Sequence, residues 1–347
     1  MTEKQATSGD LAALRGARTF VTGATGFLGW AIADALLACG AEVRALTRSR
    51  GFPGDLEARG AVAVHGDLLD QEAIDGALEG VDYVFHVAAD VRMYRAAYDE
   101  AYKNNVAATR FLVERSVHAK VKRMVFTSSG STLGKPLDAT SGPVRPVNEE
   151  SAYNFDGLGW VYPPTKYLAE CEVLAAVERG FDAVITHPTA IFGPGDWKKN
   201  LLPLFLATKQ FAGNFTTRGT RTVCDVRDVA DGHLRAALLG ERGHRYALSG
   251  ELFTVRDLMS EIAAVTGGRA PRVALPASVM ISLGRVLDRV ASMRGTVPMI
   301  SEEMAMQSVL RVEISSEKAK RVLGYKTRPA RESIADMAQW YRAQGWL

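Results

Sequence analysis

A glycine-rich stretch near the start of the chain, TGATGFLG at residues 22–29, restricts the possible folds more than any other feature. An apolar, strand-like run precedes it and a helix-like segment follows it. In such a β-α turn Gly23 allows a tight turn, Gly26 lets a diphosphate approach the backbone, and Gly29 lets the helix pack close to the strand. A bound diphosphate would then face the free N–H groups at the start of the helix. The stretch therefore predicts a dinucleotide-binding unit, with an unrelated glycine turn as the alternative.

Short apolar runs alternate with longer helical patterns up to about residue 193. The predicted strands are 18–22, 42–46, 61–65, 83–87, 123–128 and 183–188. The predicted helices are 30–39, 97–118 and 162–178. Strands this apolar, joined by helices, indicate a parallel sheet that is covered on both faces. We therefore expect an α/β fold with a Rossmann-like, doubly wound parallel sheet.

The pattern changes after residue 193. Helical segments at 255–266 and 317–323, and a strand at 245–248, are mixed with irregular stretches. This change suggests a smaller lobe over the carboxyl ends of the strands. The expected parts are a polar N-terminal extension at 1–16, an NAD(P)-binding Rossmann domain at 17–192, and mostly a C-terminal substrate-binding lobe at 193–347, with some segments returning to the sheet.

The composition argues against several classes of protein. The chain has 42 basic and 39 acidic residues, and its net charge of +3 gives no sign of nucleic-acid binding by bulk charge. Cys39, Cys171 and Cys224 lie far apart without CxxC spacing, which favours reduced thiols in the cytoplasm over a disulfide framework or a metal site. The polar residues 1–10 lack the apolar core of a signal peptide.

The best candidate for a membrane segment is 273–293, but no apolar run reaches the ~20 residues that span a bilayer. Arg285, Asp288 and Arg289 interrupt this segment. We interpret it as an amphipathic helix of the small lobe that packs on the core, and a helix on a membrane surface is the alternative. No integral membrane segment is expected.

Tyr162 and Lys166 are the strongest candidates for chemistry. They are four residues apart on a predicted helix and therefore share one face. A free Tyr has a pKa near ~10 and a free Lys near ~10.4, so neither exchanges protons readily at neutral pH. An adjacent ammonium favours phenolate, and we expect Lys166 to lower the pKa of Tyr162. Beside a nicotinamide site this pair predicts hydride transfer to or from a carbonyl, whereas a YxxxK pair taken alone is more often a surface pair.

Further candidates stand at the ends of neighbouring strands. Ser128 and Ser129 fall where open α/β sheets bind ligands, and a hydroxyl there can donate to a substrate oxygen. Ala88 and Ala89 are small enough for a ribose and a nicotinamide to lie against the backbone. Asn105 either steadies the catalytic site through a hydrogen bond or is a satisfied amide of the core.

The loop after the second predicted strand bears on the choice of cofactor. NAD-selective sites usually place an acid there, but this chain has TRSR at 47–50. Arg48 could form a fork on a 2′-phosphate, so we expect NADP(H) to be preferred, with NAD(H) as the alternative. An ordinary solvated arginine is the competing interpretation. Asp67, after the third strand, could accept from the adenine amino group or cap a helix.

These residues lie in motifs that resemble the extended short-chain dehydrogenase/reductase superfamily, and most of all its dihydroflavonol-4-reductase-like branch and the related hopanoid-associated sugar epimerases. The motifs are TGATGFLG, GDL, FHVAA, NNVAAT, VFTSSGSTLG, YPPTKYLAE, HPTAIFGPGD and VRDVADGH. The resemblance implies a catalytic triad of Ser129, Tyr162 and Lys166, with Ser129 rather than Ser128 in the matching position. It also implies cofactor contacts at Gly23, Thr25, Gly26, Phe27, Leu28, Arg48, Asp67, Leu68, Ala88 and Pro188. Ala89, Tyr162 and Lys166 are expected to contact the cofactor as well, Lys166 through a hydrogen bond to the nicotinamide ribose.

Departures from the family pattern separate the possible chemistries. Sugar-nucleotide dehydratases of this superfamily carry an Asp-Glu pair where this chain has Ser128 and Ser129, so water elimination lacks an acid and a base. UDP-sugar epimerases resemble the chain at Arg221, but they usually carry Asn at the position of His187 and hold NAD through an acid that is absent here. By contrast, VRALTRSRG at 43–51 resembles the NADPH-binding loop of the reductase branch.

The leading hypothesis is an NADPH-dependent reductase of a ketone or aldehyde, a small-molecule substrate. The alternatives are an NAD-dependent nucleotide-sugar epimerase, a 3β-hydroxysteroid-dehydrogenase-like enzyme and a non-catalytic binding protein on the same fold. Large apolar side chains near the expected pocket suggest a bulky apolar or aromatic substrate, although packing within the lobe explains them equally well. These residues are Met93, Tyr94, Phe155, Leu158, Trp160, Phe192 and Trp197. The family also implies a homodimer through the helices 97–118 and 162–178.

Overall fold

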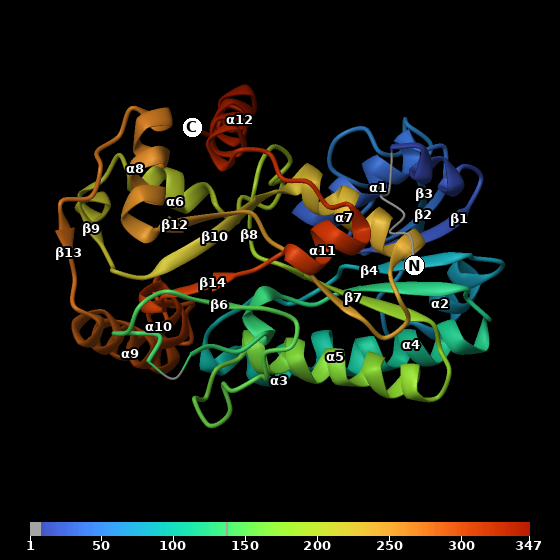
Figure 1. The fold of residues 1–347 in the computed structure, drawn as a ribbon, viewed down its shortest axis with the longest axis horizontal. Helices are drawn as coiled ribbons and strands as arrows, with labels where there is room; N and C mark the ends of the chain where they lie inside the picture. Colours follow the sequence, from blue (N-terminus) through green and yellow to red (C-terminus); the bar gives the residue numbers. More distant parts are fainter. Residues whose placement is uncertain (1–7, 137) are drawn as a thin grey trace.

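A parallel sheet forms the centre of the structure, a computed structural model that describes residues 8–136 and 138–347 (Figure 1). In this described part the sheet has seven strands in the order β11-β7-β5-β4-β1-β2-β3, and every neighbouring pair is parallel. The strands are β1 (Arg18–Thr22), β2 (Glu42–Thr47), β3 (Val62–His65), β4 (Tyr83–His86), β5 (Arg123–Thr127), β7 (Ala183–Pro188) and β11 (Arg245–Leu248). The order reverses on the two sides of β1, which confirms the predicted doubly wound, Rossmann-like fold.

Helices cover both faces of the sheet because successive side chains of each strand point to opposite sides. In β1, Val21 packs into one buried cluster and Phe20 into the other. The first cluster includes α1 (Phe27–Ala38), α7 (Val226–Leu239) and α11 (Glu317–Leu323). The second includes α2 (Gln71–Leu78), α4 (Ala108–His118) and α5 (Tyr162–Glu178). β11, α7 and α11 all follow residue 193, so segments from the later half of the chain complete the sheet and one of its layers.

The predicted helix 97–118 is interrupted in the structure. A short 3-10 turn at Arg95–Ala97 leads into α3 (Tyr98–Tyr102), a π-helical turn follows at Lys103–Ala107, and α4 begins only after it. The spacing of apolar residues along a helix does not reveal such a change in the hydrogen-bond pattern, so the π-helical turn was not predictable from the sequence.

The small lobe has its own sheets and its own core. Three strands are paired in the order β12-β10-β8, with β8 (Ala190–Phe192), β10 (Thr220–Asp225) and β12 (Glu251–Thr254). Two strand pairs join distant segments: β6 (Arg145–Val147) with β14 (Val312–Ile314), and β9 (Phe215–Thr216) with β13 (Val273–Ala274). The helices are α6 (Leu202–Ala207), α8 (Val255–Thr266), α9 (Ala277–Arg294), α10 (Glu302–Val309) and α12 (Ala330–Ala343). Short 3-10 turns occur at Gly130–Thr132 and Phe211–Asn214.

Several side chains that the sequence suggested for a substrate pocket pack inside the protein instead. Phe155 and Trp160 form a buried cluster with Leu310, and their rings stack with centroids 4.9 Å apart. Phe192 lies in the core of the small lobe beside Phe205. For these three residues the structure shows packing within the protein, which was the alternative to a role in the substrate pocket.

The N-terminal extension is not wholly polar or separate from the core. Residues 1–7 lie outside the described part of the chain. A 3-10 helix at Ser8–Leu14 follows them, and Leu14 is completely buried in the cluster that contains α1 and α7.

Residues 277–293 of the segment 273–293 form α9, which packs on α10 of the small lobe through Gly284, but part of its apolar surface stays exposed. The buried residues of α9 are Gly284, Asp288 and Ala291, whereas Leu283 and Val286 are exposed. Within the described residues no helix is long and apolar enough to cross a bilayer.

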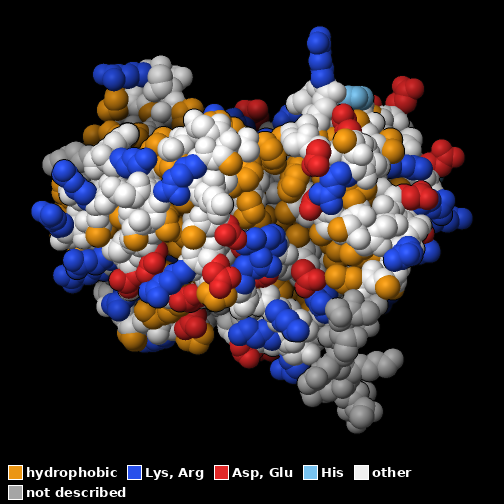
Figure 2. Space-filling model, turned by 90° about the horizontal axis from the view of Figure 1, so that it is seen from above, with side chains coloured by type: hydrophobic (Ala, Val, Ile, Leu, Met, Phe, Trp, Pro, Cys, Tyr) orange, Lys and Arg blue, Asp and Glu red, His pale blue; other side chains and the backbone are white. Residues whose placement is uncertain are grey.

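The surface has mixed charge, as the balance of acids and bases indicates. Figure 2 shows Lys and Arg side chains interspersed with Asp and Glu over one face of the molecule. Cys39, Cys171 and Cys224 are free in this structure, and Cys224 is buried.

Candidate active site

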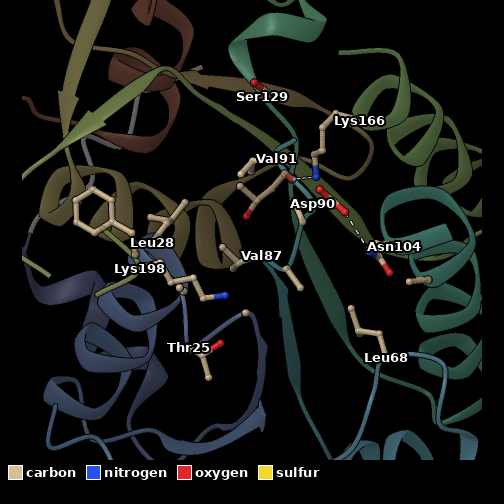
Figure 3. Close-up of a pocket in the computed structure, with 18 of the residues that line it drawn as sticks. Thr25, Leu28, Leu68, Val87, Asp90, Val91, Asn104, Ser129, Lys166 and Lys198 are labelled. Atoms are coloured by element: carbon tan, nitrogen blue, oxygen red, sulfur yellow. Dashed lines mark hydrogen bonds between the residues drawn. The ribbon is translucent and has the colours of Figure 1, made fainter. Parts of the chain in front are cut away.

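A cavity of about 620 Å³ opens at the carboxyl edge of the central sheet. The loops after β1, β2, β3, β4, β5 and β7 all contribute to it, because the carboxyl ends of parallel strands meet at one edge. Figure 3 shows Thr25 and Leu28 on one side of this cavity, with Lys166 and Ser129 on another. The residues proposed for the cofactor from the sequence all line it: Gly23, Thr25, Gly26, Phe27, Leu28, Arg48, Asp67, Leu68, Ala88, Ala89, Tyr162, Lys166 and Pro188.

The glycine turn after β1 brings backbone segments closer together than side chains would allow. Gly23 has a φ of +78°, and a Cβ there would stand 2.8 Å from the backbone nitrogen of Ala88. A Cβ at Gly29 would stand 2.2 Å from the carbonyl oxygen of Gly23. α1 begins after Gly26 without a side-chain cap, so its first N–H groups are left for another acceptor. The close approach, the uncapped helix and the cavity fit a dinucleotide diphosphate.

The far end of the cavity carries Arg48 and Asp67. Their side chains form an ion pair with Nη1 and Oδ2 3.6 Å apart, and three quarters of the Arg48 side chain is exposed. Asp67 is not the cap of α2, because Asp70 takes that position by accepting from the N–H of Ala73. Asp67 instead accepts from the N–H of Leu69 within the loop.

At the other end, the first turn of α5 places Tyr162 and Lys166 on the cavity wall. Pro163 and Pro164 occupy the first helical positions, where a missing N–H costs little. Lys166 is 2% exposed, donates from Nζ to the carbonyl oxygen of Thr127 at 2.7 Å, and lies 4.4 Å from the centroid of the Phe126 ring. Burial lowers the pKa of Lys166 to about 7, although the charge of Glu170 acts in the opposite direction.

The prediction that Lys166 lowers the pKa of Tyr162 is wrong for this structure. Burial raises the pKa of Tyr162 above its ordinary value, the charge of Glu303 also raises it, and a hydrogen bond with Ser129 acts against them. Lys166 does not contribute to this shift in pKa. Its ammonium donates to the backbone of β5, and burial lowers its own pKa.

The two adjacent serines have different surroundings. The Ser128 hydroxyl is buried and donates to Oε2 of Glu170 at 2.6 Å. The Ser129 hydroxyl accepts from the N–H and the hydroxyl of Ser131 and forms the hydrogen bond with Tyr162. Both serines line the cavity, and of the two only Ser129 affects the pKa of Tyr162.

Asn105 is buried in the π-helical turn and does not line the cavity. Its Nδ2 donates to the carbonyl oxygen of Asp90 and to Thr165 Oγ1, and its Oδ1 accepts from the N–H of Asp90. Asn105 therefore ties the loop after β4 to the first turn of α5, and its amide has no remaining proton for a substrate.

Two features of the site were missed in the sequence. Glu303 of α10 accepts from the N–H of Val161 at 2.7 Å and, more weakly, from that of Tyr162 at 3.4 Å, and so caps α5. Nothing local could have shown this, because the partners are over 140 positions apart. Lys198 lines the cavity and extends into it in Figure 3. Its position two residues after the GPGD motif was a usable signal.

Comparison with known proteins agrees with this geometry. The model of the NAD dependent epimerase/dehydratase family matches residues 19–249. The chain belongs to this family. It is therefore an extended short-chain dehydrogenase/reductase and an NAD(P)-dependent oxidoreductase.

Relatives match this family member over nearly its whole length. A putative dihydroflavonol 4-reductase of Synechocystis sp. is 30% identical and covers 94% of the chain and 95% of the relative. Sterol demethylase protein B of Methylococcus capsulatus is 31% identical, with 95% and 99% covered. The crystal structure of gox2253 is 32% identical with a TM-score of 0.80, and the match covers 95% and 99% of the two chains.

Proposed function

We propose that this protein is an NADPH-dependent reductase of a ketone or aldehyde, able to run in reverse as a dehydrogenase. The supporting observation is that Ser129, Tyr162 and Lys166 line the same cavity as the glycine turn. In this proposal NADP(H) binds with its diphosphate at the start of α1 and supplies the hydride. The chain's own residues then manage the carbonyl oxygen and its proton.

Tyr162 is the proposed proton donor to the carbonyl oxygen. With its pKa raised by burial, the phenol stays protonated at neutral pH and is ready to donate. Ser129 holds the phenol by a hydrogen bond and can donate to the same oxygen as negative charge develops there. Lys166, with a pKa of about 7, can gain and lose a proton near neutral pH and so help, through an intervening water, to replace the proton that Tyr162 gives up.

The preference for NADP(H) rests on Arg48. The loop after β2 offers this guanidinium at the cavity wall, and its high exposure leaves it free to turn from Asp67 to a 2′-phosphate. Lys198 adds a second cation to the wall.

A bulky apolar substrate is proposed from the catalytic end of the cavity and from the relatives. Val91, Pro188 and Ile191 line the wall there. The names of the two sequence relatives refer to a dihydroflavonol and a sterol, both large ring systems. The expected homodimer through the segments 97–118 and 162–178 stays a prediction.

Turnover of NADPH with a panel of aliphatic, aromatic and polycyclic ketones tests the proposal. We expect oxidation of NADPH with the bulky ketones and much slower oxidation of NADH. Absence of turnover with every carbonyl in the panel would contradict the reductase.

The alternative is an epimerase, and Arg221 favours it. Burial lowers the pKa of this guanidinium to about 10, and its Nη1 donates to the carbonyl oxygen of Thr220. A nucleotide diphosphate would suit such a group. However, Arg221 does not line the cavity. Tightly bound NAD in the purified protein, with interconversion of nucleotide sugars and no use of added NADPH, would favour the epimerase.

A further inference from the structure

α9 is attached to the small lobe by its smallest residues. Gly284 lies so close to α10 that a Cβ on it would stand 2.6 Å from Cβ of Ala305 and 2.7 Å from the carbonyl oxygen of Ser301. Asp288 and Ala291, the other buried residues of α9, follow on the same side at helical spacing. The closest contact of α9 with α10 is thus made by small residues, and the larger apolar residues Met280, Ile281 and Leu287 are only partly buried.

The outer side of α9 carries the large apolar residues. Val279, Leu283, Val286 and Met293 recur at intervals of four, three and seven residues, which places them in one row along the helix. Their exposed fractions are 49%, 42%, 58% and 79%. Val297 and Met299 continue the exposed apolar surface beyond the helix, at 71% and 81%. We call these six residues the α9 stripe.

The segment that carries the α9 stripe is mostly basic. Between residues 269 and 299 the chain has five arginines, all exposed, and a single acid, the buried Asp288. One arginine, Arg285, is paired with Glu302 of α10. The arginines are Arg269, Arg272, Arg285, Arg289 and Arg294. Elsewhere the chain is nearly balanced, so this local excess is a property of the segment.

We propose that the α9 stripe and its arginines bind the surface of an anionic lipid bilayer. The apolar row would enter the boundary between headgroups and acyl chains, while the arginines at its sides pair with lipid phosphates. The long arginine side chains can reach the headgroups while their apolar stems stay beside the stripe. The helix lies on the membrane and does not cross it, because its inner side is fixed to α10 and carries a buried acid.

Charge favours a lipid surface over a second copy of this chain. A symmetric dimer through the α9 stripe would bring the same exposed arginines of both copies together with no exposed acid of this segment to neutralise them. An anionic bilayer meets the same arginines with opposite charge.

The position of α9 makes such binding compatible with a working active site. Figure 1 places α9 and α10 at the outer edge of the small lobe, away from β1, β2 and β3. α10, on which α9 packs, also supplies Glu303 to the first turn of α5. The proposed membrane surface is therefore one helix away from the catalytic tyrosine, on the side opposite the nucleotide turn.

Co-sedimentation of the full chain with lipid vesicles tests the proposal. We expect binding to vesicles of phosphatidylcholine mixed with phosphatidylglycerol, weaker binding to phosphatidylcholine alone, and loss of binding as salt is raised. The double variant Leu283→Ser/Val286→Ser should bind at least about tenfold more weakly. Arg289→Gln and Arg294→Gln should each weaken binding by about fivefold.

Val62→Ser is the matched control, since Val62 is 60% exposed on β3 at the other end of the molecule. This variant should bind vesicles as the unaltered protein does. Thermal unfolding of every variant checks that the fold is intact. The proposal is overturned if the unaltered protein ignores anionic vesicles, if Val62→Ser loses binding equally, or if sedimentation shows a dimer that Leu283→Ser/Val286→Ser dissociates.

Discussion

At the scale of single residues, Lys166 shows a conflict between activity and stability. Its ammonium is almost fully buried, and the groups in contact with it are a carbonyl oxygen and an aromatic ring, neither of which carries a negative charge. Such surroundings keep the pKa near 7, which suits proton exchange but makes the charged form costly to bury.

Replacing Lys166 by Met should therefore stabilise the protein while abolishing its activity. The pKa of Lys166 is about 7 when folded and ~10.4 when unfolded, so between these values the unfolded chain binds more protons. The cost of burying the charge is greatest below pH ~7 and fades as the pH rises towards ~10. We expect Lys166→Met to raise the free energy of unfolding by about 2 kcal/mol near pH 6, with a smaller gain at higher pH.

Denaturant unfolding across this pH range measures the effect. Lys326→Met, a change at an exposed lysine, is the control and should show no such pH dependence. A Lys166→Met protein that is less stable than the unaltered one near pH 6 would show that its contacts outweigh the burial of its charge.

Arg48 is the second test at this scale. Arg48→Gln should weaken NADPH binding about tenfold and leave NADH binding unchanged, because only the 2′-phosphate distinguishes the two. Arg50→Gln is the matched control, since Arg50 is exposed in the same loop but does not line the cavity. Titration by nucleotide fluorescence measures both. Equal losses for the two nucleotides would refute the role of Arg48 in selectivity.

At the scale of elements, Glu303 of α10 caps α5 and so links the small lobe to the helix that carries Tyr162. Burial raises the pKa of Glu303 to about 7, so above this pH a carboxylate lies beside the first turn of α5 and raises the pKa of Tyr162. Asp288 and Glu302 add negative charge near Glu303, and Arg95 faces Asp288 and Glu302 from the loop after β4.

Glu303→Gln should move the alkaline limit of carbonyl reduction to lower pH. The amide oxygen can still accept from the N–H of Val161, but without the negative charge the phenol of Tyr162 loses its proton at lower pH. Glu302→Gln, a change at the neighbouring acid that does not contact α5, should move the limit far less. The pH profile of kcat/KM measures this, and an unchanged profile would contradict the coupling.

The elements also show what the sequence could reveal. The strands were predictable because a sheet buried on both faces requires continuous apolar runs such as those of β4 and β7. The cavity lining followed from topology, since parallel strands bring their carboxyl ends together even when they are distant in sequence.

Other features depended on contacts that leave no local pattern. Glu303 reaches α5 from a different lobe, and α9 makes its closest contact through Gly284 while Leu283 and Val286 stay exposed. The pKa of Tyr162 was predicted with the wrong sign because spacing along a helix does not reveal where the Lys166 ammonium points.

At the scale of the whole molecule, buried neutral histidines should make the fold sensitive to acid. His86 is hydrogen-bonded to Thr22 and Thr109, and His233 to Thr127 and Thr186. Burial lowers the pKa of His86 to about 3 and that of His233 to about 4. His187 is also buried with a lowered pKa.

We expect the unfolding midpoint to fall steadily as the pH drops from ~6.5 towards ~4. In this window the unfolded chain protonates these histidines and the folded one does not, so the stability present above ~6.5 is lost on acidification. Glu303 acts in the opposite direction, because its raised pKa makes the folded protein gain a proton first, but it offsets only one histidine.

In His233→Gln the unfolding midpoint, measured by calorimetry over the same pH range, should fall less steeply than in the unaltered protein, whatever the stability of the variant at neutral pH. His65→Gln is the control, because His65 is exposed at the end of β3. A decline equally steep in His233→Gln and in the unaltered protein would mean that other groups cause the acid sensitivity.

The most direct test of the proposed chemistry is the activity of Tyr162→Phe with NADPH and the best carbonyl substrate of the panel. The account predicts a loss of about 10²–10⁴-fold in kcat with unchanged NADPH binding, because only the transferable proton is removed. Tyr167→Phe, a change at the tyrosine that stacks on Tyr153 further along α5, should keep full activity. Full activity in Tyr162→Phe would contradict the account.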